Sequence, residues 1–529
     1  MTMVSDWHDL EQARCALQAK LDGHKSQAER NKLGQFATPT QLARDVLAHG
    51  LSLLPQGAPI RFLDPAIGTG SFYSALRAVS AEHQVQSATG FEIDPHYGEP
   101  AQTLWAQTPL CLALTDFTRQ TAPADDQAKA SLLICNPPYV RHHHLGSDEK
   151  LRLQSASEIA AHVKLPGLAG LYCYFMALAH PWMCEGGIAG WLIPSEFMDV
   201  NYGRALKAYL LREVSLLHIH RFDPNDVQFD DALVSSAIVW FKKSKPTADH
   251  HATFSYGGSM QAPAMVKHVS VADLERTDKW TRFPKQDAQV EHHGYRLGDL
   301  FAVKRGLATG DNSFFILDEA KVRSLKLPPR FLRPVLPSAR YIQVDEINGD
   351  DDGVPLLDKR LFLLDCDWPA EQVESNYPAL WAYLQTGLAD VAPGYLCQSR
   401  RFWYAQERRA AAPIVCTYIG RSDHARRPFR FLLNNTRAVA TNVYLMLYPQ
   451  PLLASALARD PRVMRSLWQG LNAIAPETLL GNGRVYGGGM HKLEPKELAN
   501  VPADDLAVIA GLGSIRAPRQ MELMEALGV

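Results

Sequence analysis

The fold of this chain is decided by residues 61–72, Arg61-Phe62-Leu63-Asp64-Pro65-Ala66-Ile67-Gly68-Thr69-Gly70-Ser71-Phe72. An apolar run leads into a glycine turn and then into residues that can start a helix, which is the order strand, tight turn, helix. Glycines at positions 68 and 70 let the backbone approach a ligand closely, and the first turn of the helix offers free N–H groups. A glycine pair alone is typical of many nucleotide-binding folds, so the neighbouring segments have to narrow the choice.

Short apolar segments alternate with helical segments on both sides of this turn. The segments with the length and composition of strands are 60–63, 88–93, 110–114, 132–135, 188–193, 216–219 and 236–241. Such alternation predicts an α/β fold built on a doubly wound, mostly parallel sheet. Upstream, spaced Leu and Ala residues predict one amphipathic helix over residues 7–30, and a second helix is predicted over residues 40–54.

The length of 529 residues, with 46% hydrophobic and 21% charged residues, indicates a folded protein of two or three domains. The stretch Lys242-Lys243-Ser244-Lys245-Pro246 marks the end of the first domain. We expect an N-terminal helical segment (1–30), an α/β domain (31–245), a linker or domain extension (246–294) and an α+β C-terminal domain (295–529). The last domain is rich in Pro, Gly and isolated aromatics, and its periodicity does not determine its fold.

Composition argues against several classes of protein. No apolar run reaches the length of about 18 residues that spans a bilayer, and the polar N-terminus has no signal-peptide core. The eight cysteines are scattered without a CxxC pair, which favours reduced thiols in a cytoplasmic protein over a zinc site or a disulfide framework. We therefore expect no membrane partner and no metal.

Two further strand ends carry acids that suit a nucleoside. Glu92 and Asp94 end the second predicted strand about twenty residues beyond the glycines, where an acid can accept hydrogen bonds from both ribose hydroxyls. Glu92 is preferred because it lies nearer the strand end. Asp116, at the end of the third strand, can accept from an adenine amino group while Phe117 packs on the base. Three such strand ends in succession predict an adenosine-containing cofactor across the carboxyl ends of the sheet, whereas the turn lacks the Gly-Lys-Ser/Thr ending of a P-loop.

The fourth predicted strand ends in Asn136-Pro137-Pro138-Tyr139. Its two prolines fix φ, remove two N–H donors and restrict the residues before them, so the loop is stiff. The loop offers carbonyl acceptors, a side-chain amide and an aromatic face, which suit the grip of a planar ring through its exocyclic amino group. A rigid turn without chemistry is the alternative for these four residues alone.

Together, the glycine turn, the strand-end acids and the loop at 136–139 resemble the S-adenosylmethionine-dependent adenine-N6 DNA methyltransferases. The order of segments resembles the gamma class of TaqI-like enzymes, because Gly34-Gln35-Phe36-Ala37-Thr38-Pro39 comes first, the loop follows, and a large domain comes last. The similarity continues in 172–175, 186–197, 227–237, 305–312 and 487–493. It implies a class I (Rossmann-like) methyltransferase fold, S-adenosyl-L-methionine as the cofactor and a C-terminal target-recognition domain.

The resemblance also implies roles for individual residues. The reaction would be methyl transfer to N6 of an adenine flipped out of double-stranded DNA. Asn136 and the Pro137 carbonyl would accept the two N6 hydrogens. Tyr139 and Phe229 would stack on the two faces of the base, with Phe222 as a competitor for the second place. The residues implied to hold the cofactor are Thr38, Asp64, Ala66, Gly68, Glu92, Asp116, Phe117 and Asn136.

Contact with DNA is expected from cationic residues, although the net charge of the chain is only −2. Between residues 400 and 437, nine arginines face two acids, a local excess of +7 that is interspersed with aromatics. The residues expected to contact DNA are Arg141, Arg305, Thr309, Arg400, Arg401, Arg426 and Arg427. His142-His143-His144 suggests a metal site, but adjacent histidines on a regular element cannot all face one ion, so DNA contact or a solvated loop is preferred.

Other functions stay open at this stage. Similar loops occur in enzymes that methylate a glutamine amide of release factors and in ribosomal-RNA guanine methyltransferases, but the segment at 34–39 and the long C-terminal half favour DNA. A fused restriction endonuclease is suggested by Glu494-Pro495-Lys496, which no convincing partner acid precedes. An inactive DNA-binding subunit is a third alternative, against which the intact loop argues.

We expect a cytoplasmic, nucleoid-associated prokaryotic enzyme of a restriction-modification or related host-defence or epigenetic system. The recognition sequence, the oligomeric state and a partnership with a cognate restriction endonuclease are not determined by the sequence.

Overall fold

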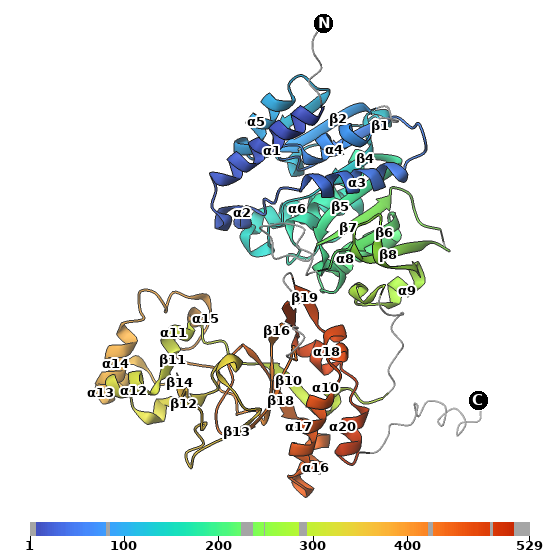
Figure 1. Ribbon diagram of the computed structural model, residues 1–529. Coiled ribbons are helices and arrows are strands. Elements are labelled where there is room, and N and C mark those ends of the chain that lie inside the picture. Colours follow the sequence, from blue (N-terminus) through green and yellow to red (C-terminus); the bar gives the residue numbers. More distant parts are fainter. Residues whose placement is uncertain are drawn as a thin grey trace, which may run out of the picture. The chain divides into compact units, whose positions relative to one another are not determined.

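The computed structural model describes residues 7–80, 85–223, 236–247, 249–284, 294–421, 427–486 and 490–512 (Figure 1). The chain forms two compact units. Unit 1 comprises Met1–Val290 and Tyr486–Gly488, and unit 2 comprises Glu291–Val485 and Gly489–Val529. Among the helices described here, none has the length and apolar character needed to cross a membrane.

Unit 1 is built on a nine-stranded sheet with the order β3-β2-β1-β4-β5-β7-β6-β8-β9. Its first seven strands are β1 (Ile60–Asp64), β2 (Val85–Glu92), β3 (Leu110–Leu114), β4 (Ala130–Cys135), β5 (Met183–Pro194), β6 (Ser215–Arg221) and β7 (Ser236–Lys242). The pairs β1–β2, β1–β4, β2–β3 and β4–β5 are parallel, whereas β7 is antiparallel to β5 and β6. The doubly wound, mostly parallel sheet predicted from the sequence is confirmed, and its strand order reverses between β1 and β4.

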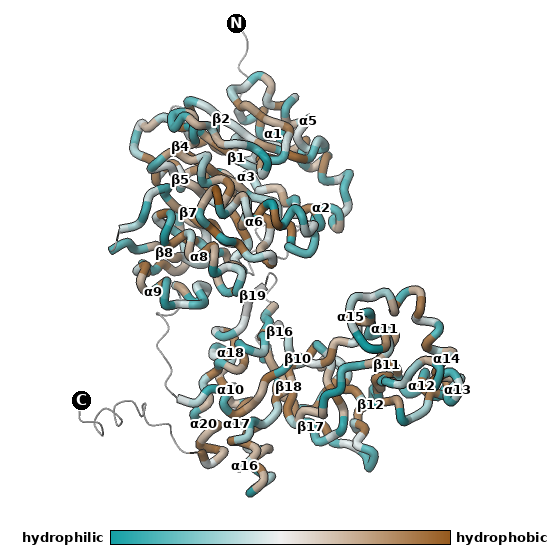
Figure 2. Tube along the Cα trace, turned by 180° about the vertical axis from the view of Figure 1, so that it is seen from behind, coloured by the Kyte–Doolittle hydropathy of each residue, from teal (hydrophilic) through white to brown (hydrophobic). Residues whose placement is uncertain are grey.

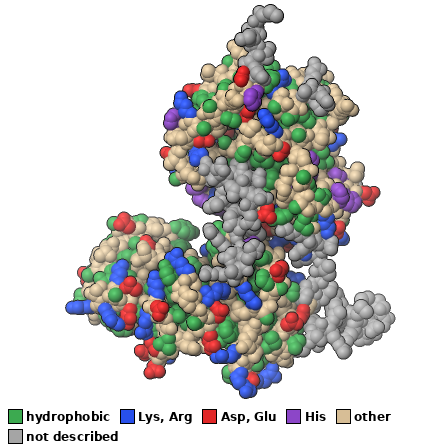
Figure 3. Space-filling model, viewed as in Figure 1, with side chains coloured by type: hydrophobic (Ala, Val, Ile, Leu, Met, Phe, Trp, Pro, Cys, Tyr) green, Lys and Arg blue, Asp and Glu red, His purple; other side chains and the backbone are tan. Residues whose placement is uncertain are grey.

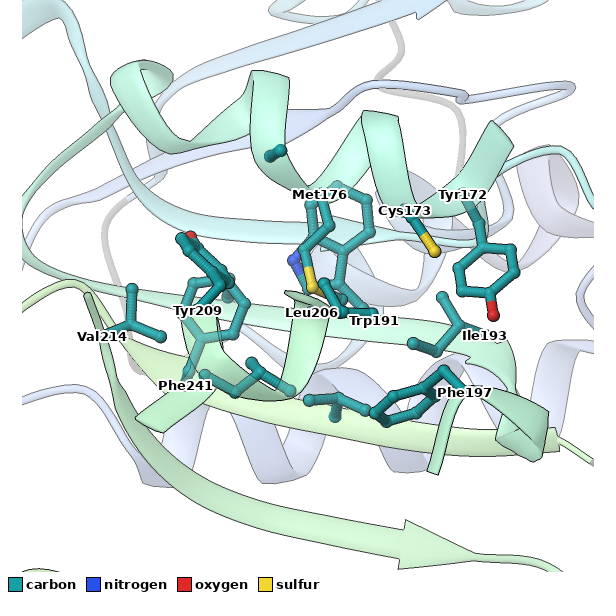
Figure 4. Close-up of a cluster of buried hydrophobic side chains, with 14 of the residues drawn as sticks. Tyr172, Cys173, Met176, Trp191, Ile193, Phe197, Leu206, Tyr209, Val214 and Phe241 are labelled. Atoms are coloured by element: carbon teal, nitrogen blue, oxygen red, sulfur yellow. The ribbon is translucent and has the colours of Figure 1, made fainter. Parts of the chain in front are cut away.

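Helices cover both faces of this sheet (Figure 1). One face carries α3 (Thr40–Ser52), α4 (Ser71–Val79) and α5 (Pro95–Trp105), and the other carries α6 (Ser147–Ala161), α7 (Leu171–Ala179) and α8 (Gly203–Arg212). Because both faces are covered, central strands are continuous apolar runs, and Leu132, Leu133 and Ile134 of β4 are fully buried. Figure 2 shows the hydrophobic stretches concentrated toward the centre of unit 1. On the second face, Met176 of α7 packs near the fully buried Trp191 of β5 (Figure 4).

The N-terminal segment forms two helices, so the prediction of a single helix over residues 7–30 is wrong. The first, α1 (Trp7–Gly23), ends at Gly23, and the second, α2 (Gln27–Leu33), begins after Ser26. Ser26 and Glu29 form a capping box: the Glu29 N–H donates to the Ser26 side chain, and the Ser26 N–H donates to the Glu29 carboxylate. This pattern is a helix-start signal that a reading by periodicity alone overlooks.

Residues 251–276 extend the sheet of unit 1. The strands β8 (His251–Gly258) and β9 (Pro263–Ser270) follow β6 in the sheet, and α9 (Val271–Arg276) comes after them. β8 is parallel to β6 and antiparallel to β9. The sequence left this region as a linker or domain extension, and its described part is sheet and helix.

Unit 2 is of the expected α+β type. Its described residues form a five-stranded sheet, β10-β18-β15-β17-β13, and two three-stranded sheets, β11-β14-β12 and β16-β20-β19. The strands are β10 (Phe301–Arg305), β11 (Ile316–Asp318), β12 (Leu332–Val335), β13 (Glu346–Asn348), β14 (Leu361–Leu364), β15 (Ile414–Thr417), β16 (Ile419–Arg421), β17 (Phe431–Asn435), β18 (Tyr444–Pro449), β19 (Arg484–Tyr486) and β20 (Met490–Lys492). The helices are α10 (Leu297–Leu300), α11 (Asn312–Phe315), α12 (Glu319–Ser324), α13 (Ala370–Asn376), α14 (Pro378–Gln385), α15 (Tyr395–Gln398), α16 (Pro451–Arg459), α17 (Val463–Ala473), α18 (Pro476–Asn482), α19 (Pro495–Ala499) and α20 (Asp504–Ile509).

Candidate active site

A cavity of about 640 Å³ lies at the carboxyl ends of β1 to β4, where the strand order of the sheet reverses. Open α/β sheets bind ligands at this position. The predicted cofactor residues that line the cavity are Ala66, Gly68, Glu92, Asp116, Phe117 and Asn136. Thr38 lines a cavity of about 290 Å³ that shares Gln18, Asp22, Phe36 and Ala37 with the larger one. The structure thus brings most of the predicted cofactor residues to one place.

Glu92 ties the end of β2 to the glycine turn. Its Oε2 accepts a hydrogen bond from the Gly68 N–H at 3.0 Å, and its Oε1 accepts one from the Asp94 N–H at 2.8 Å. Burial raises the pKa of Glu92 above its ordinary value, and the two N–H donors oppose this shift. Each carboxylate oxygen has a second lone pair, so both can still accept from the hydroxyls of a ribose.

Asp64 is only 1% exposed and lies beneath the floor of the cavity, although the sequence prediction placed it in the lining. Its Oδ1 accepts a hydrogen bond from the Ala66 N–H at 3.1 Å. Burial raises the pKa of Asp64 to about 8, and the nearby charge of Glu92 adds to this effect. Asp64 therefore holds the backbone of the turn that faces the ligand.

The end of β3 forms another wall of the cavity. Asp116 Oδ1 accepts from the N–H two residues later at 2.9 Å and so caps a short 3₁₀ turn. Phe117 is 3% exposed, and its ring centroid lies 5.4 Å from that of Phe91 and 5.6 Å from that of Phe175. Ile93, which the sequence reading did not single out, lines the cavity with 64% of its surface exposed. A large aliphatic side chain between two acids at a strand end is the signal that could have found it.

Asn136 has its side-chain amide held in one orientation. Its Nδ2 donates to the Phe36 carbonyl oxygen at 3.0 Å and to Thr38 Oγ1 at 3.1 Å, so segment 34–39 packs on the loop at 136–139. Its buried Oδ1 has no hydrogen-bond partner within the described part of the chain. Asn136 therefore presents a fixed acceptor beside the cofactor cavity.

Tyr139 is buried, with 8% of its surface exposed. Its hydroxyl donates to the Leu192 carbonyl oxygen at 3.1 Å, and its ring centroid lies 5.6 Å from that of Phe36. The Gly34 carbonyl accepts from the Tyr139 N–H at 3.2 Å. This close approach requires glycine, because a Cβ at position 34 would lie 2.3 Å from the Tyr139 nitrogen.

The N-terminal segment supplies a wall that the sequence reading missed. Lys25 pairs with Asp94 at 2.5 Å, and Gln35 Nε2 donates to the same Oδ2 at 2.7 Å. Burial by itself would raise the pKa of Asp94. The hydrogen bonds from Lys25 and Gln35 have the larger combined effect, so the pKa of Asp94 lies below its ordinary value. Gln18 and Asp22 line the cavity as well. No spacing in the sequence links this segment to the strand ends.

The residues expected to contact DNA are placed in different ways. Arg141 is exposed beside the loop at 136–139, and Arg401 and Arg427 are exposed in unit 2. Arg400 donates to the carbonyl oxygens of residues 308 and 309 at 2.8 Å each, and Arg305 lies 4.5 Å from a tyrosine ring at position 418. Phe229 and Arg426 lie outside the described residues.

Thr309 is 2% exposed, and its hydroxyl donates to Asn312 Oδ1 at 2.7 Å. The local arginine excess is partly balanced by acids distant in the sequence, since Arg430 pairs with Asp345 at 2.6 Å. Figure 3 accordingly shows basic and acidic side chains interspersed on the visible face of unit 2. Glu494, part of the suggested nuclease pattern, caps α19 and accepts from a tyrosine hydroxyl at 2.7 Å.

The reversed strand order, the cavity at the reversal and the acids at successive strand ends fit a class I methyltransferase that uses S-adenosylmethionine, and the relatives of the chain assign it to that class. Residues 102–228 match the family described as Eco57I restriction-modification methylase, and residues 285–518 match the C-terminal domain of the Type II methyltransferase M.Eco57I. The chain belongs to this family of Type II restriction-modification methyltransferases, which makes it a DNA methyltransferase of the restriction-modification type.

Curated relatives match over most of their length. The chain is 30% identical over 480 residues to Type II methyltransferase M.XamI of Xanthomonas campestris pv. amaranthicola, covering 88% of this chain and 84% of the relative. It is 25% identical over 498 residues to M.AccI of Acinetobacter calcoaceticus, covering 91% and 87%. Among solved structures, the Type IIL restriction-modification enzyme MmeI in complex with DNA has a TM-score of 0.50 at 12% identity, covering 92% of this chain and 74% of that one.

Proposed function

We propose that the protein is a site-specific adenine-N6 DNA methyltransferase of the gamma class, which flips adenine out of double-stranded DNA before methyl transfer. The observation that carries the proposal is Asn136. Its amide nitrogen is held by segment 36–38, and its buried oxygen, beside the cofactor cavity, has no hydrogen-bond partner within the described residues. Leaving a buried acceptor unpaired is costly, which supports a ligand that brings an N–H donor.

Bound S-adenosylmethionine supplies a methyl group that its sulfonium charge makes electrophilic. The amino nitrogen of adenine is a poor nucleophile because its lone pair is delocalised into the ring. When the Asn136 oxygen and the Pro137 carbonyl accept its two hydrogens, the nitrogen moves toward sp³ geometry. The same two acceptors stabilise the positive charge that develops on it. The stiff Pro137-Pro138 backbone keeps the acceptors in place during the reaction.

Aromatic side chains would hold the flipped base. Stacking contributes about 1–3 kcal/mol per base, which offsets much of the cost of a few kcal/mol for flipping. Tyr139, whose hydroxyl is anchored to the Leu192 carbonyl, is the proposed wall on one side. Phe222 is 5% exposed and its ring lies 4.7 Å from that of His220, so it belongs to the core, which supports Phe229 as the second wall.

DNA is the proposed substrate, and unit 2 is the proposed target-recognition domain. The names of the relatives, and of MmeI as a restriction-modification enzyme in complex with DNA, support both proposals. Cationic residues would contact the duplex, namely Arg141, Arg305, Arg400, Arg401, Arg426 and Arg427. Thr309, which is 2% exposed, would support the neighbouring backbone without touching DNA. In such a system the partner would be a cognate restriction endonuclease.

Transfer of labelled methyl groups from S-adenosylmethionine tests this proposal. Purified protein is offered unmethylated duplex DNA, ribosomal RNA or a release factor, and the labelled product is identified by mass spectrometry. We expect N6-methyladenine in DNA, formed about 10²–10³-fold more slowly by Asn136→Ala and at the wild-type rate by Asn376→Ala, a change of an exposed asparagine in unit 2. Label in RNA or protein alone would overturn the proposal.

A further inference from the structure

A further cavity, of about 330 Å³, lies in unit 2. We call it the arginine cavity, and its lining residues are Arg330, Arg333, Asp365, Arg408, Arg409 and Ala410. Arg333 lies on β12, Asp365 directly follows β14, and the last three residues belong to a loop before β15. Residues from three separate segments thus converge on one hollow whose lining carries four positive charges and one negative charge.

The arginines of this cavity are held in place by their surroundings. The Arg330 guanidinium lies 4.5 Å from the centroid of the Trp368 ring, and its Nη1 donates to the Tyr377 hydroxyl at 2.8 Å. Arg333 Nη2 donates to the carbonyl oxygen of Arg409. Donors fixed in this way lose little entropy when a ligand binds, which favours recognition over a loose electrostatic contact.

Arg408 stands at the exposed side of the cavity. Its side chain is 63% exposed and pairs with Asp367 at 2.9 Å. Arg409 is paired with an acid as well, since it donates two bonds of 2.6 and 2.8 Å to Glu407. Arg333 and Arg408 are the two lining arginines whose guanidinium groups approach the Asp365 carboxylate.

Asp365 gives the cavity an acceptor as well as donors. Its side chain is 4% exposed, and its Oδ2 lies 3.5 Å from Arg333 and 3.6 Å from Arg408. Its Oδ1 is buried and makes no hydrogen bond to any residue that the structure describes. A buried carboxylate oxygen without a partner calls for an explanation, and a ligand that donates a hydrogen bond provides one.

Arginine donors beside an unpaired acceptor on Asp365 distinguish the phosphate backbone of DNA from the edge of a base pair. A phosphodiester offers only acceptors and carries a negative charge, so it would satisfy the arginines but leave the Asp365 oxygen unpaired and repelled. The major-groove edge of a G·C pair presents two adjacent acceptors, N7 and O6 of guanine, beside the donor N4 of cytosine. An A·T pair presents adenine N7 and thymine O4 as acceptors with the adenine amino group between them, so it has no two adjacent acceptors for the paired donors of an arginine.

We propose that the arginine cavity reads a G·C base pair of the recognition sequence, with Arg333 and Arg408 donating to guanine and Asp365 accepting from the cytosine amino group. This inference rests on the proposed function and adds to it the place in unit 2 where one position of the DNA sequence is specified. Backbone contacts elsewhere position the duplex, and this cavity contributes sequence information.

The test compares the recognition sequences of the wild type and of Arg408→Ala and Asp365→Asn variants. Each is expressed in a methylation-free host, and modified bases are mapped by single-molecule sequencing. We then measure kcat/KM on duplexes in which each G·C pair of the wild-type sequence is replaced in turn. In both variants, the ratio of kcat/KM between the original and the substituted duplex should fall by about 10- to 100-fold at one and the same G·C position. At every other position this ratio should stay at the wild-type value.

Arg462→Ala is the matched control, because Arg462 is 91% exposed in the same unit, away from the cavity lining. A duplex with 7-deazaguanine at the affected position should lower kcat/KM for methyl transfer by the wild type. The same duplex should not lower kcat/KM of Arg408→Ala any further. Unfolding temperatures confirm that the variants are folded. The inference is overturned if both variants keep the wild-type sequence preference, if their activity falls equally on all duplexes, or if the wild-type recognition sequence contains no G·C pair. Modification of a base other than adenine would contradict the proposed function, while the mapped sequence would still test the cavity.

Discussion

Replacement of Gly34 by alanine should impair methyl transfer far more than it impairs folding. Gly34 has a φ of +66° and ends α2, directly against the catalytic loop. A Cβ at this position would lie 2.3 Å from the Tyr139 nitrogen and 2.8 Å from the Val140 nitrogen, where ordinary contacts begin at 3.4 Å. The loop at 136–139 would have to move by about 1 Å, and a misplacement of that size costs on the order of 100-fold in rate.

Gly57 offers the matched control. It has a φ of +74°, but an added Cβ would meet nothing within 4 Å. Both alanine variants carry the strain of a left-handed backbone, about 1–2 kcal/mol, and the clash with the Tyr139 backbone adds to the loss of thermal stability in Gly34→Ala alone. Only Gly34→Ala should lose turnover, which labelled methyl transfer on duplex DNA measures as kcat, with unfolding temperatures recorded in parallel. If Gly34→Ala keeps the kcat of Gly57→Ala, the argument that this glycine positions the catalytic loop is refuted.

Three further outcomes are expected. Asn136→Ala should lower kcat by about 10²–10³-fold because one of the two acceptors for the adenine amino group is lost. Calorimetry should find the affinity for S-adenosylmethionine unchanged. An unchanged kcat would rule out Asn136 as one of these acceptors. Lys25→Met removes the ion pair that holds Asp94 at the cavity wall, and should raise the Kd for S-adenosylmethionine about tenfold by calorimetry; an unaltered Kd would show that this wall is not used. Burial raises the pKa of Asp64 to about 8 from 3.8, so between these pH values the folded state keeps a proton that the unfolded state releases. The protonated Asp64 therefore contributes fully to the free energy of unfolding below about pH 4, and this contribution is lost as the pH rises toward 8. Asp64→Asn should remove this loss of unfolding free energy, which is on the order of 1.4 kcal/mol per pH unit in the wild type. Urea midpoints of the wild type and of Asp64→Asn, measured at pH 5 and pH 7, test this. An equal change of the midpoint between the two pH values in both proteins would contradict the expectation.

Unit 1 could be predicted from the sequence because its signals are local. Buried parallel strands read as short apolar runs, and each run ends in the residues that face the cavity. Glu92, Asp116 and Asn136 were found in this way. The burial of Tyr139 could not be predicted, since it depends on the Leu192 carbonyl, which follows the loop by more than fifty residues.

The contributions of the N-terminal segment and of unit 2 were harder to predict, because they depend on pairs distant in the sequence. Lys25 reaches Asp94 across 69 positions, and no periodicity encodes that contact. Counting charges between residues 400 and 437 likewise overlooked Asp345 and Asp365, which approach Arg430 and Arg408 only in the fold. A run of arginines in the sequence therefore indicates a cationic segment. Which of its guanidinium groups are paired with acids can be known only from the fold.

The central claim is that Asn136 and its loop direct methyl transfer to the N6 atom of adenine. Nucleoside analysis of DNA from a methylation-free host expressing the wild type or Asn136→Ala tests it most directly. The account predicts abundant N6-methyladenine with the wild type and, because kcat falls by about 10²–10³-fold, far less with the variant at equal protein level. N4-methylcytosine or C5-methylcytosine from the wild type, or wild-type levels of N6-methyladenine from the Asn136→Ala variant, would contradict it.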